Sequence, residues 1–151
     1  MASSRFAPLQ RLVISIAVLA SFVTFLDGTV VTVALPAISD ELGGGITTQQ
    51  WVVDAYLITL SALILLAGSL SDAYGRVLVM RIGLIAFGVA SVAVAAAPDP
   101  LILIIARAAQ GAAGALLVPS SLALITATMR ADVQSRAIGV WTAFTLSLIH
   151  I

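Results

Sequence analysis

Four long stretches of this chain consist almost entirely of apolar residues, and they limit its fold more than any other feature. They span about residues 12–36, 51–70, 77–97 and 101–129, and a fifth begins near Ser135. About 20 consecutive apolar residues suffice for an α-helix to cross the hydrocarbon core of a bilayer. Because lipid offers no hydrogen-bond partners, such a segment must satisfy its backbone groups internally, as a helix does. The sequence therefore predicts an all-α membrane protein with four to five transmembrane helices.

The composition agrees with a membrane protein and argues against other classes. Hydrophobic residues make up 61% of the chain and charged residues only 9%, whereas about a quarter of a typical soluble domain is charged. The absence of cysteine and a single histidine give no disulfide framework and no metal site, and the zero net charge does not suggest nucleic acid as a partner. No nucleophile–base pair is visible, so we do not expect an enzyme. Every cation is arginine, which GC-rich codons favour, so we expect a bacterial source.

Short turn signals separate the apolar stretches. Pro36 ends the first of them, and Gly43–Gly45 is typical of a flexible turn before the second. Thr47 or Thr48 is expected to cap the N-terminus of the second helix. Gly75 is suited to a C-terminal cap at the other end of that helix.

The arginines indicate the orientation in the membrane. Six lie in loops or at helix ends, and in an up-and-down arrangement all fall on one side: Arg5, Arg11, Arg76, Arg81, Arg130 and Arg136. The other two connections contain Asp40, Glu41 and Asp99 and no arginine. By the positive-inside rule the arginine side is cytoplasmic. We therefore expect a multi-pass protein of the cell (inner) membrane, with a cytoplasmic N-terminus and with the turns at Gly43 and at Pro98–Pro100 outside.

The N-terminus resembles a signal peptide, and we expect the last six residues to differ in origin from the rest of the protein. Arg5 and Arg11 followed by an apolar run resemble a signal peptide, but the run is too long for one and contains Asp27, which indicates an uncleaved first span. Residues 146–151, LSLIHI, match the peptide encoded by a common sequencing-library transposon end. We expect them to be a sequencing artefact, the alternative being a genuine continuation of the fifth helix. Residues 1–145 are then a partial N-terminal transmembrane half.

Three ionisable residues lie within the predicted spans: Asp27, Asp54 and Arg107. A charge at the centre of a membrane helix costs roughly 2.5–3.5 kcal/mol on insertion scales, so each is a candidate functional residue. The structural alternative is that they only pair with one another or lie near the membrane surface. Asp54 lies about one turn inside the outer end of its span, where water can reach it.

Helical spacing places small and polar residues beside these charges. One stripe of the second span comprises Asp54, Ile58, Ser61, Leu65, Gly68 and Asp72. A stripe of the fourth comprises Arg107, Gln110, Gly111, Gly114, Ala115 and Val118. The first is expected to face protein or a water-filled cavity rather than lipid. Small residues on the second allow close helix packing, which by itself explains the glycines but not the arginine.

Two segments resemble signatures of the major facilitator superfamily. Residues 68–76, GSLSDAYGR, resemble the signature between its second and third helices, and they match the pattern at Gly68, Leu70, Asp72, Gly75 and Arg76. Ala73 and Val77 stand where basic residues are usual, and Arg81 partly offsets the lost charge. Residues 107–111, RAAQG, resemble the fourth-helix signature of the same superfamily.

Two further segments are similar to one branch of that superfamily, the fourteen-span drug:proton antiporters. Residues 26–36, LDGTVVTVALP, resemble the first-helix motif of the branch, with Thr32 in place of the usual Asn. Residues 51–57, WVVDAYL, resemble the start of its second helix. The resemblance covers nearly everything from Leu12 to Phe144, in the expected order and on the expected sides of the membrane.

The resemblance implies the N-terminal part of the major facilitator fold and a role in proton-coupled efflux. Members exchange a substrate for protons by alternating access between two six-helix halves. The resemblance assigns substrate and proton binding to Asp27, Asp54, Arg107 and Gln110. It assigns a cytoplasmic gate to Gly68, Asp72, Gly75 and Arg76. Helix packing is assigned to Gly111, Gly114 and Ala115 by their small size and helical spacing.

The same resemblance implies a proton gradient as energy source and no cofactor. The expected partners are protons, a small-molecule substrate, the lipid bilayer and the missing C-terminal half of the same chain. The leading hypothesis is a multidrug antiporter present here as an incomplete fragment. The alternatives are an exporter of a metabolite, sugar or siderophore, and a non-transporting membrane module.

Overall fold

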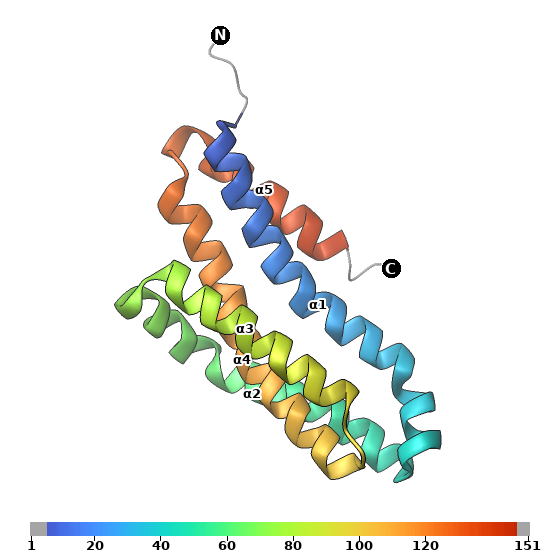
Figure 1. Ribbon diagram of the computed structural model, residues 1–151. Coiled ribbons are helices and arrows are strands. Elements are labelled where there is room, and N and C mark those ends of the chain that lie inside the picture. The colour runs from blue at the N-terminus through green and yellow to red at the C-terminus, as the bar shows by residue number, and fades with distance from the viewer. Residues whose placement is uncertain (1–5, 148–151) are drawn as a thin grey trace.

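The computed structural model describes residues 6–147, which form five helices (Figure 1). They are α1 (Pro8–Leu42), α2 (Gly45–Tyr74), α3 (Arg76–Ala95), α4 (Pro100–Thr128) and α5 (Ala131–Ser147). The first four are long and apolar enough to cross a membrane. They cover the four apolar stretches of the sequence, and α1 and α2 extend beyond them by a turn or more at each end.

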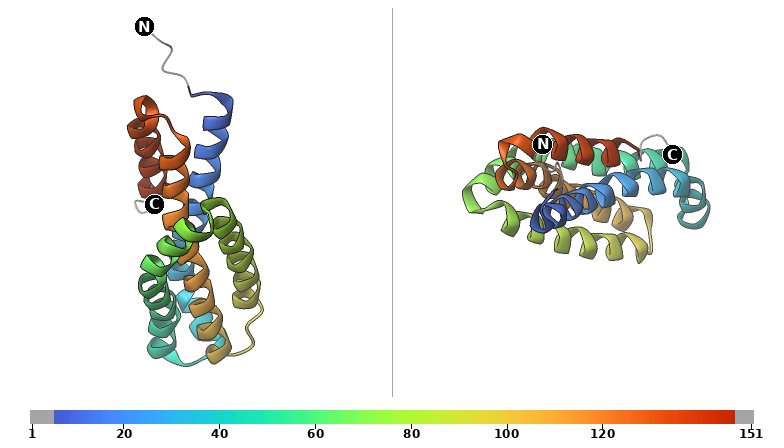
Figure 2. Two further views of the ribbon diagram at one scale, coloured as in Figure 1. Left: turned by 90° about the vertical axis from the view of Figure 1, so that its left-hand side faces the viewer. Right: turned by 90° about the horizontal axis from the view of Figure 1, so that it is seen from above.

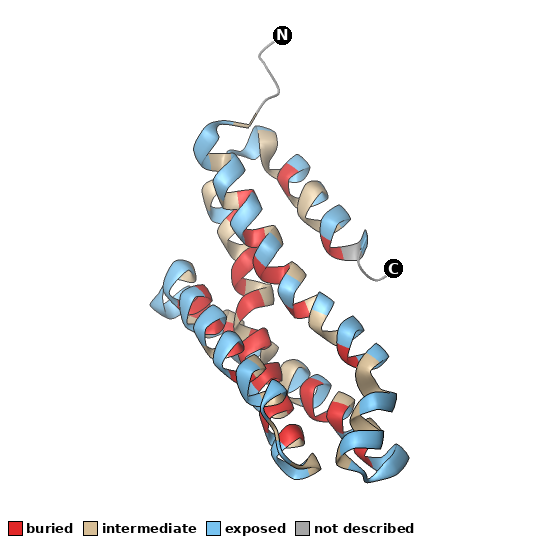
Figure 3. Ribbon diagram, turned by 45° about the vertical axis from the view of Figure 1, so that its right-hand side comes forward, coloured by how far each residue is buried: buried red, intermediate tan, exposed pale blue. Residues whose placement is uncertain are grey.

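Helix α4 lies at the centre of the bundle and contacts each of the other four helices. One apolar cluster contains residues from all of the first four helices: Ala20, Tyr56, Met80, Phe87, Ala113 and Leu117. A second cluster, between α1, α4 and α5, contains Ile14, Ala17, Ile125, Met129 and Ala137. Helices α2 and α3 thus flank the earlier turns of α4, and α5 lies beside its last turns and the start of α1 (Figure 2). Buried residues follow this shared interior, and the outward faces are exposed (Figure 3).

The α1–α2 turn corrects two expectations. Helix α1 continues through Pro36 to Leu42; prolines are tolerated inside membrane helices, where neighbouring groups and local adjustments compensate for the lost hydrogen bond. Helix α2 begins directly after Gly44, whose φ of +85° is left-handed, and no side chain caps it. The prediction of a cap at Thr47 or Thr48 is therefore wrong, because the glycines reverse the chain before either threonine is reached.

The other turns follow the sequence signals. Gly75, with a φ of +96°, ends α2 and its N–H donates to the Ser71 carbonyl at 3.2 Å. Asp99 caps α4 by accepting a hydrogen bond from the Ile102 N–H at 3.0 Å. The α2–α3 and α4–α5 turns lie toward the left of Figure 1, opposite the α1–α2 and α3–α4 turns at the lower right. The arginines at these junctions and at the start of α1 therefore lie toward one end of the bundle.

Helix α5 begins at Ala131, four residues before the predicted start, and is joined to α1 and α4 by a polar contact. The Trp141 indole N–H donates to the Ser21 hydroxyl at 3.0 Å, and the Ser21 and Ser121 hydroxyls are 2.7 Å apart. Of the suspected artefact at 146–151, helix α5 includes the first two residues, and residues 148–151 lie outside the described range.

The contact between α2 and α4 depends on Gly111. A Cβ atom at this position would overlap the backbone carbonyl of Tyr56 and the Thr59 hydroxyl, so the two backbones could not approach as closely. We predict that Gly111→Ala lowers the free energy of unfolding by about 1–3 kcal/mol, the usual cost of overpacking. Gly88→Ala is the control, because a Cβ there meets no atom within 4 Å. Thermal unfolding of the full-length protein in detergent measures both, and equal midpoints would contradict the packing described here.

Candidate functional site

An ion pair between α1 and α4 forms the centre of the candidate site. Arg107 on α4 is 1% exposed, and its Nη1 donates to Oδ2 of Asp27 on α1 at 2.5 Å. The Asp27 side chain is 17% exposed. A buried charge without a partner is strongly destabilising, so the two residues neutralise each other inside the bundle.

Gln110 connects the two charged groups. It lies one turn after Arg107 on the same face of α4, as the i, i+3 spacing requires. Its amide Nε2 donates to Oδ1 of Asp27 at 2.7 Å, and its Oε1 accepts from Arg107 Nη1 at 2.7 Å. Both carboxylate oxygens of Asp27 therefore accept hydrogen bonds from α4.

Helices α2 and α3 complete the shell around this pair. The Arg107 Nε donates to the Val52 carbonyl at 3.1 Å, and its guanidinium carbon lies 4.3 Å from the centre of the Tyr56 ring. Gln110 Nε2 also donates to the Ser91 hydroxyl at 3.0 Å. All four spanning helices thus contribute an atom to what we call the Asp27 network: Asp27, Val52, Tyr56, Ser91, Arg107 and Gln110.

Close packing of α4 brings these groups within reach of one another. Gly111 and Gly114 are both buried, and Ala115 is fully buried. A Cβ at Gly114 would lie 3.1 Å from the Thr24 methyl group. The Tyr56 hydroxyl donates to the Thr24 carbonyl at 3.0 Å, so the same aromatic side chain contacts α1 and covers the arginine.

The structure does not bring the remaining predicted site residues into this network. Asp54 is exposed on α2 and forms no ion pair or hydrogen bond within residues 6–147. Asp72 and Arg76 form an exposed i, i+4 pair, with 3.5 Å between Oδ1 and Nη2, at the α2–α3 junction. Gly68 lies one turn before Asp72, and Gly75 forms the turn itself.

The predicted stripe of α2 does not face the other described helices. Ile58 and Leu65, its apolar members, are 57% and 84% exposed. The side of α2 that packs inward instead includes Val52, Tyr56, Ala67 and Ser71, of which the last accepts a hydrogen bond from the Ser120 hydroxyl at 3.2 Å. The reason is the close contact of the Tyr56 backbone with Gly111, which sets the rotation of α2 about its own axis.

Tyr56 and Ser91 are the members of the network that contribute a side chain and to which the sequence alone assigned no role; Val52 contributes only its backbone carbonyl. A tyrosine in an apolar span is a signal in retrospect, because a buried hydroxyl needs a hydrogen-bond partner. Ser91 gives a weaker signal, since a serine in a membrane helix can also bond to its own backbone, as Ser91 does with the Phe87 carbonyl at 2.8 Å. Within the described range, no three His, Cys, Asp or Glu side chains gather in a way that could hold a metal ion.

The fold and the network together define a multi-pass α-helical membrane protein with a charge pair inside its helix bundle. The family model "Major Facilitator Superfamily" matches residues 17–147, and the chain belongs to that superfamily. The residues described here are the first helices of the major facilitator fold.

Relatives with curated names include several resistance and efflux proteins. The puromycin resistance protein pur8 of Streptomyces alboniger is 43% identical over 82% of this chain and 25% of its own length. The multidrug efflux pump LfrA of Mycolicibacterium smegmatis is 41% identical over 78% of this chain and 24% of its own length. The multidrug resistance protein Stp of Mycobacterium tuberculosis is 41% identical over 81% of this chain and 23% of its own length. The chain thus spans about a quarter of the length of these relatives.

The unequal burial of the two charges generates a prediction about stability. Asp27→Asn leaves the fully buried Arg107 without a counter-charge and should lower the free energy of unfolding by about 3–5 kcal/mol. Arg107→Gln should cost less, because the Asp27 carboxylate is partly exposed and can be hydrated or protonated. The double variant Asp27→Asn/Arg107→Gln leaves no unpaired charge and should recover part of the loss.

Thermal unfolding of the full-length variants tests this order. Asp72→Asn serves as the control, because it breaks an exposed pair that is worth no more than about 1 kcal/mol. A double variant whose loss equals the sum of the two single losses would contradict a direct Asp27–Arg107 interaction.

Proposed function

We propose that the full-length protein is a proton-coupled exporter of drugs or related small organic molecules, and that this chain supplies the first helices of its N-terminal half. The observation that carries the proposal is the Asp27 network, a charge pair held inside the helix bundle of a major facilitator protein. The names of the relatives, which refer to puromycin resistance and multidrug efflux, support drugs as the class of substrate.

Asp27 is the member of the pair that can exchange its partner. Its carboxylate is 17% exposed, whereas Arg107 is 1% exposed. When a proton or a cationic substrate neutralises Asp27, Arg107 still has the Val52 carbonyl, the Gln110 side-chain oxygen and the Tyr56 ring as partners. The guanidinium therefore keeps hydrogen-bond acceptors inside the bundle although it loses its counter-charge, and the proton gradient acts on the carboxylate.

Neutralisation of Asp27 also weakens the attachment of α1 to α4. In the paired state the carboxylate accepts charge-assisted hydrogen bonds from Arg107 and Gln110, and such bonds are about twice as strong as neutral ones. A protonated carboxyl accepts weaker ones. Binding at Asp27 thereby changes how firmly the first helix is held, which is the kind of local change that can bias alternating access.

The peripheral residues have supporting roles in this proposal. Asp72 and Arg76 belong to the cytoplasmic gate, where an exposed pair of low net energy can be broken and remade during each cycle. Asp54, exposed near the outer end of α2, contributes negative charge to the path of a cationic substrate or proton. Both roles require the half of the transporter that follows this chain.

The role of Asp27 predicts the result of one substitution. Asp27→Asn should abolish efflux driven by an imposed pH gradient, because the asparagine cannot exchange a proton. Efflux by the full-length protein is measured in inverted membrane vesicles with a panel of cationic and neutral drugs. Asp132→Asn, which removes an exposed carboxylate paired with Arg130 and distant from the network, should leave efflux unchanged.

The measurement includes a test of folding for each variant. Where Asp27→Asn alone reduces the amount of folded protein, the charge-balanced variant Asp27→Asn/Arg107→Gln takes its place and should also be inactive. Proton-driven efflux that persists for every substrate in the folded variants would show that the role assigned to Asp27 is wrong.

The proposed orientation places the arginine-rich end in the cytoplasm and has its own test. Single cysteines replace Glu41 at one end and Ala73 at the other, both exposed, in a full-length protein without other cysteines. In intact cells a membrane-impermeant maleimide should label the cysteine at position 41 and not the one at position 73. The reverse pattern would place the N-terminus outside.

A further inference from the structure

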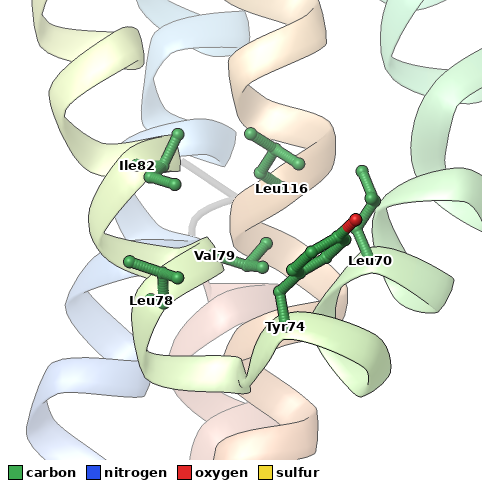
Figure 4. Close-up of a pocket in the computed structure, with 6 residues that line it drawn as sticks. All are labelled: Leu70, Tyr74, Leu78, Val79, Ile82 and Leu116. Carbon is green, nitrogen blue, oxygen red and sulfur yellow. The ribbon is translucent and has the colours of Figure 1, made fainter.

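An apolar groove runs along the side of the helix bundle between α2 and α3 (Figure 4). One part is a cavity of about 260 Å³ lined by Leu70, Tyr74, Leu78, Val79, Ile82 and Leu116. A second cavity, of about 390 Å³, shares Leu70 and Leu116 with it and continues the groove to Leu63. The distance along α2 from Tyr74 to Leu63 is about 16 Å at 1.5 Å per residue, similar to the thickness of one hydrocarbon leaflet.

The groove follows from how the helices pack. Helices α2 and α3 each lie along α4 but contact one another much less. The side chain of Leu116 on α4 therefore forms the floor between them, against Gly83, where a Cβ would lie only 3.0 Å from the Leu116 Cβ. The lining is hydrocarbon apart from the Tyr74 hydroxyl, so the groove suits a flexible apolar chain.

Arg81 carries a positive charge on the same turn of α3 as the groove residues Leu78 and Ile82, although it is not itself part of the lining. It is exposed on α3, one turn after Leu78 and directly before Ile82, and it pairs with no acidic residue in the described part of the chain. Side chains on a helix lean toward its N-terminus, which for α3 is the end with the other arginines. Arg81 lies only about 7.5 Å from that end, so its guanidinium can reach the headgroup layer while its stem follows the apolar surface.

We propose that this groove binds an anionic phospholipid, with one acyl chain between α2 and α3 and the phosphate group on Arg81. Tyr74, 69% exposed at the end of α2, lies where aromatic side chains commonly meet the headgroups. An apolar protein segment in the groove would leave Arg81 without a counter-charge, whereas an anionic lipid supplies both the chain and the charge. The site is separate from the Asp27 network and does not depend on what is transported.

Lipid retention by the purified full-length protein tests the proposal. The protein is equilibrated in detergent with equal amounts of phosphatidylglycerol and phosphatidylcholine, and the bound lipid is counted by native mass spectrometry. The wild type should retain phosphatidylglycerol preferentially. Arg81→Gln should reduce its retention about five-fold, as expected for one cation near a membrane surface. Arg130→Gln is the matched control, because it removes an exposed arginine that is paired with Asp132 away from the groove.

A second pair of variants tests the position of the acyl chain. Ile82→Trp fills the groove and should displace the lipid, whereas Ile85→Trp, on the same helix but outside the lining, should not. Equal retention of the two lipids by the wild type, or equal losses in Arg81→Gln and Arg130→Gln, would overturn the proposal. None of these readouts depends on efflux, so they stand apart from the proposed transport function.

Discussion

The buried charge of Arg107 is the constraint around which the four spanning helices are arranged. In a low-dielectric interior a guanidinium must be neutralised and its N–H groups must find acceptors. No single neighbouring helix supplies all of these: the counter-charge comes from Asp27 on α1, a carbonyl from Val52 and a ring face from Tyr56 on α2. Ser91 on α3 holds the Gln110 amide that completes the set. The electrostatic requirement of one residue on α4 thus fixes the mutual positions of three other helices.

Close packing and charge neutralisation depend on each other at this point. The Val52 carbonyl and the Tyr56 ring reach Arg107 only because α2 lies against Gly111, where any side chain would overlap the Tyr56 backbone. Van der Waals packing between small residues is a main source of helix association in lipid. The hydrophobic effect does not drive helices together there, because the lipid tails are as apolar as the helix surfaces. The polar contacts then select one rotation of α2 among those that such packing would permit.

The sequence predicts much of what depends on local chemistry, although the expected helix end at Pro36 and the expected threonine cap of α2 are wrong. Hydropathy identifies the four spans, and Gly75 marks the end of α2 because a positive φ is a local requirement. The pairing of Asp27 with Arg107 was one of the alternatives that intramembrane charge leaves open. The rotation of each helix is not local: lipid and protein interior are equally apolar, so the exposed stripe of α2 cannot be told from its buried one by hydropathy. For the same reason Tyr56 and Ser91 gave no clear signal, since their partners lie on other helices.

The central position of α4 separates two different environments along a single helix. Near Arg107 and Gln110 its neighbours converge on polar atoms, and the partly exposed carboxylate of Asp27 gives access to the pair. At Leu116, nine residues or about 13 Å further along the axis, the space between α2 and α3 is lined by hydrocarbon. Because both features depend on how α2 and α3 lie against α4, a shift of α2 against α4 would change both the contacts of Arg107 and the width of the groove. A lipid bound there would then favour one arrangement of the helices over the other, through the differential contact that any such bias requires.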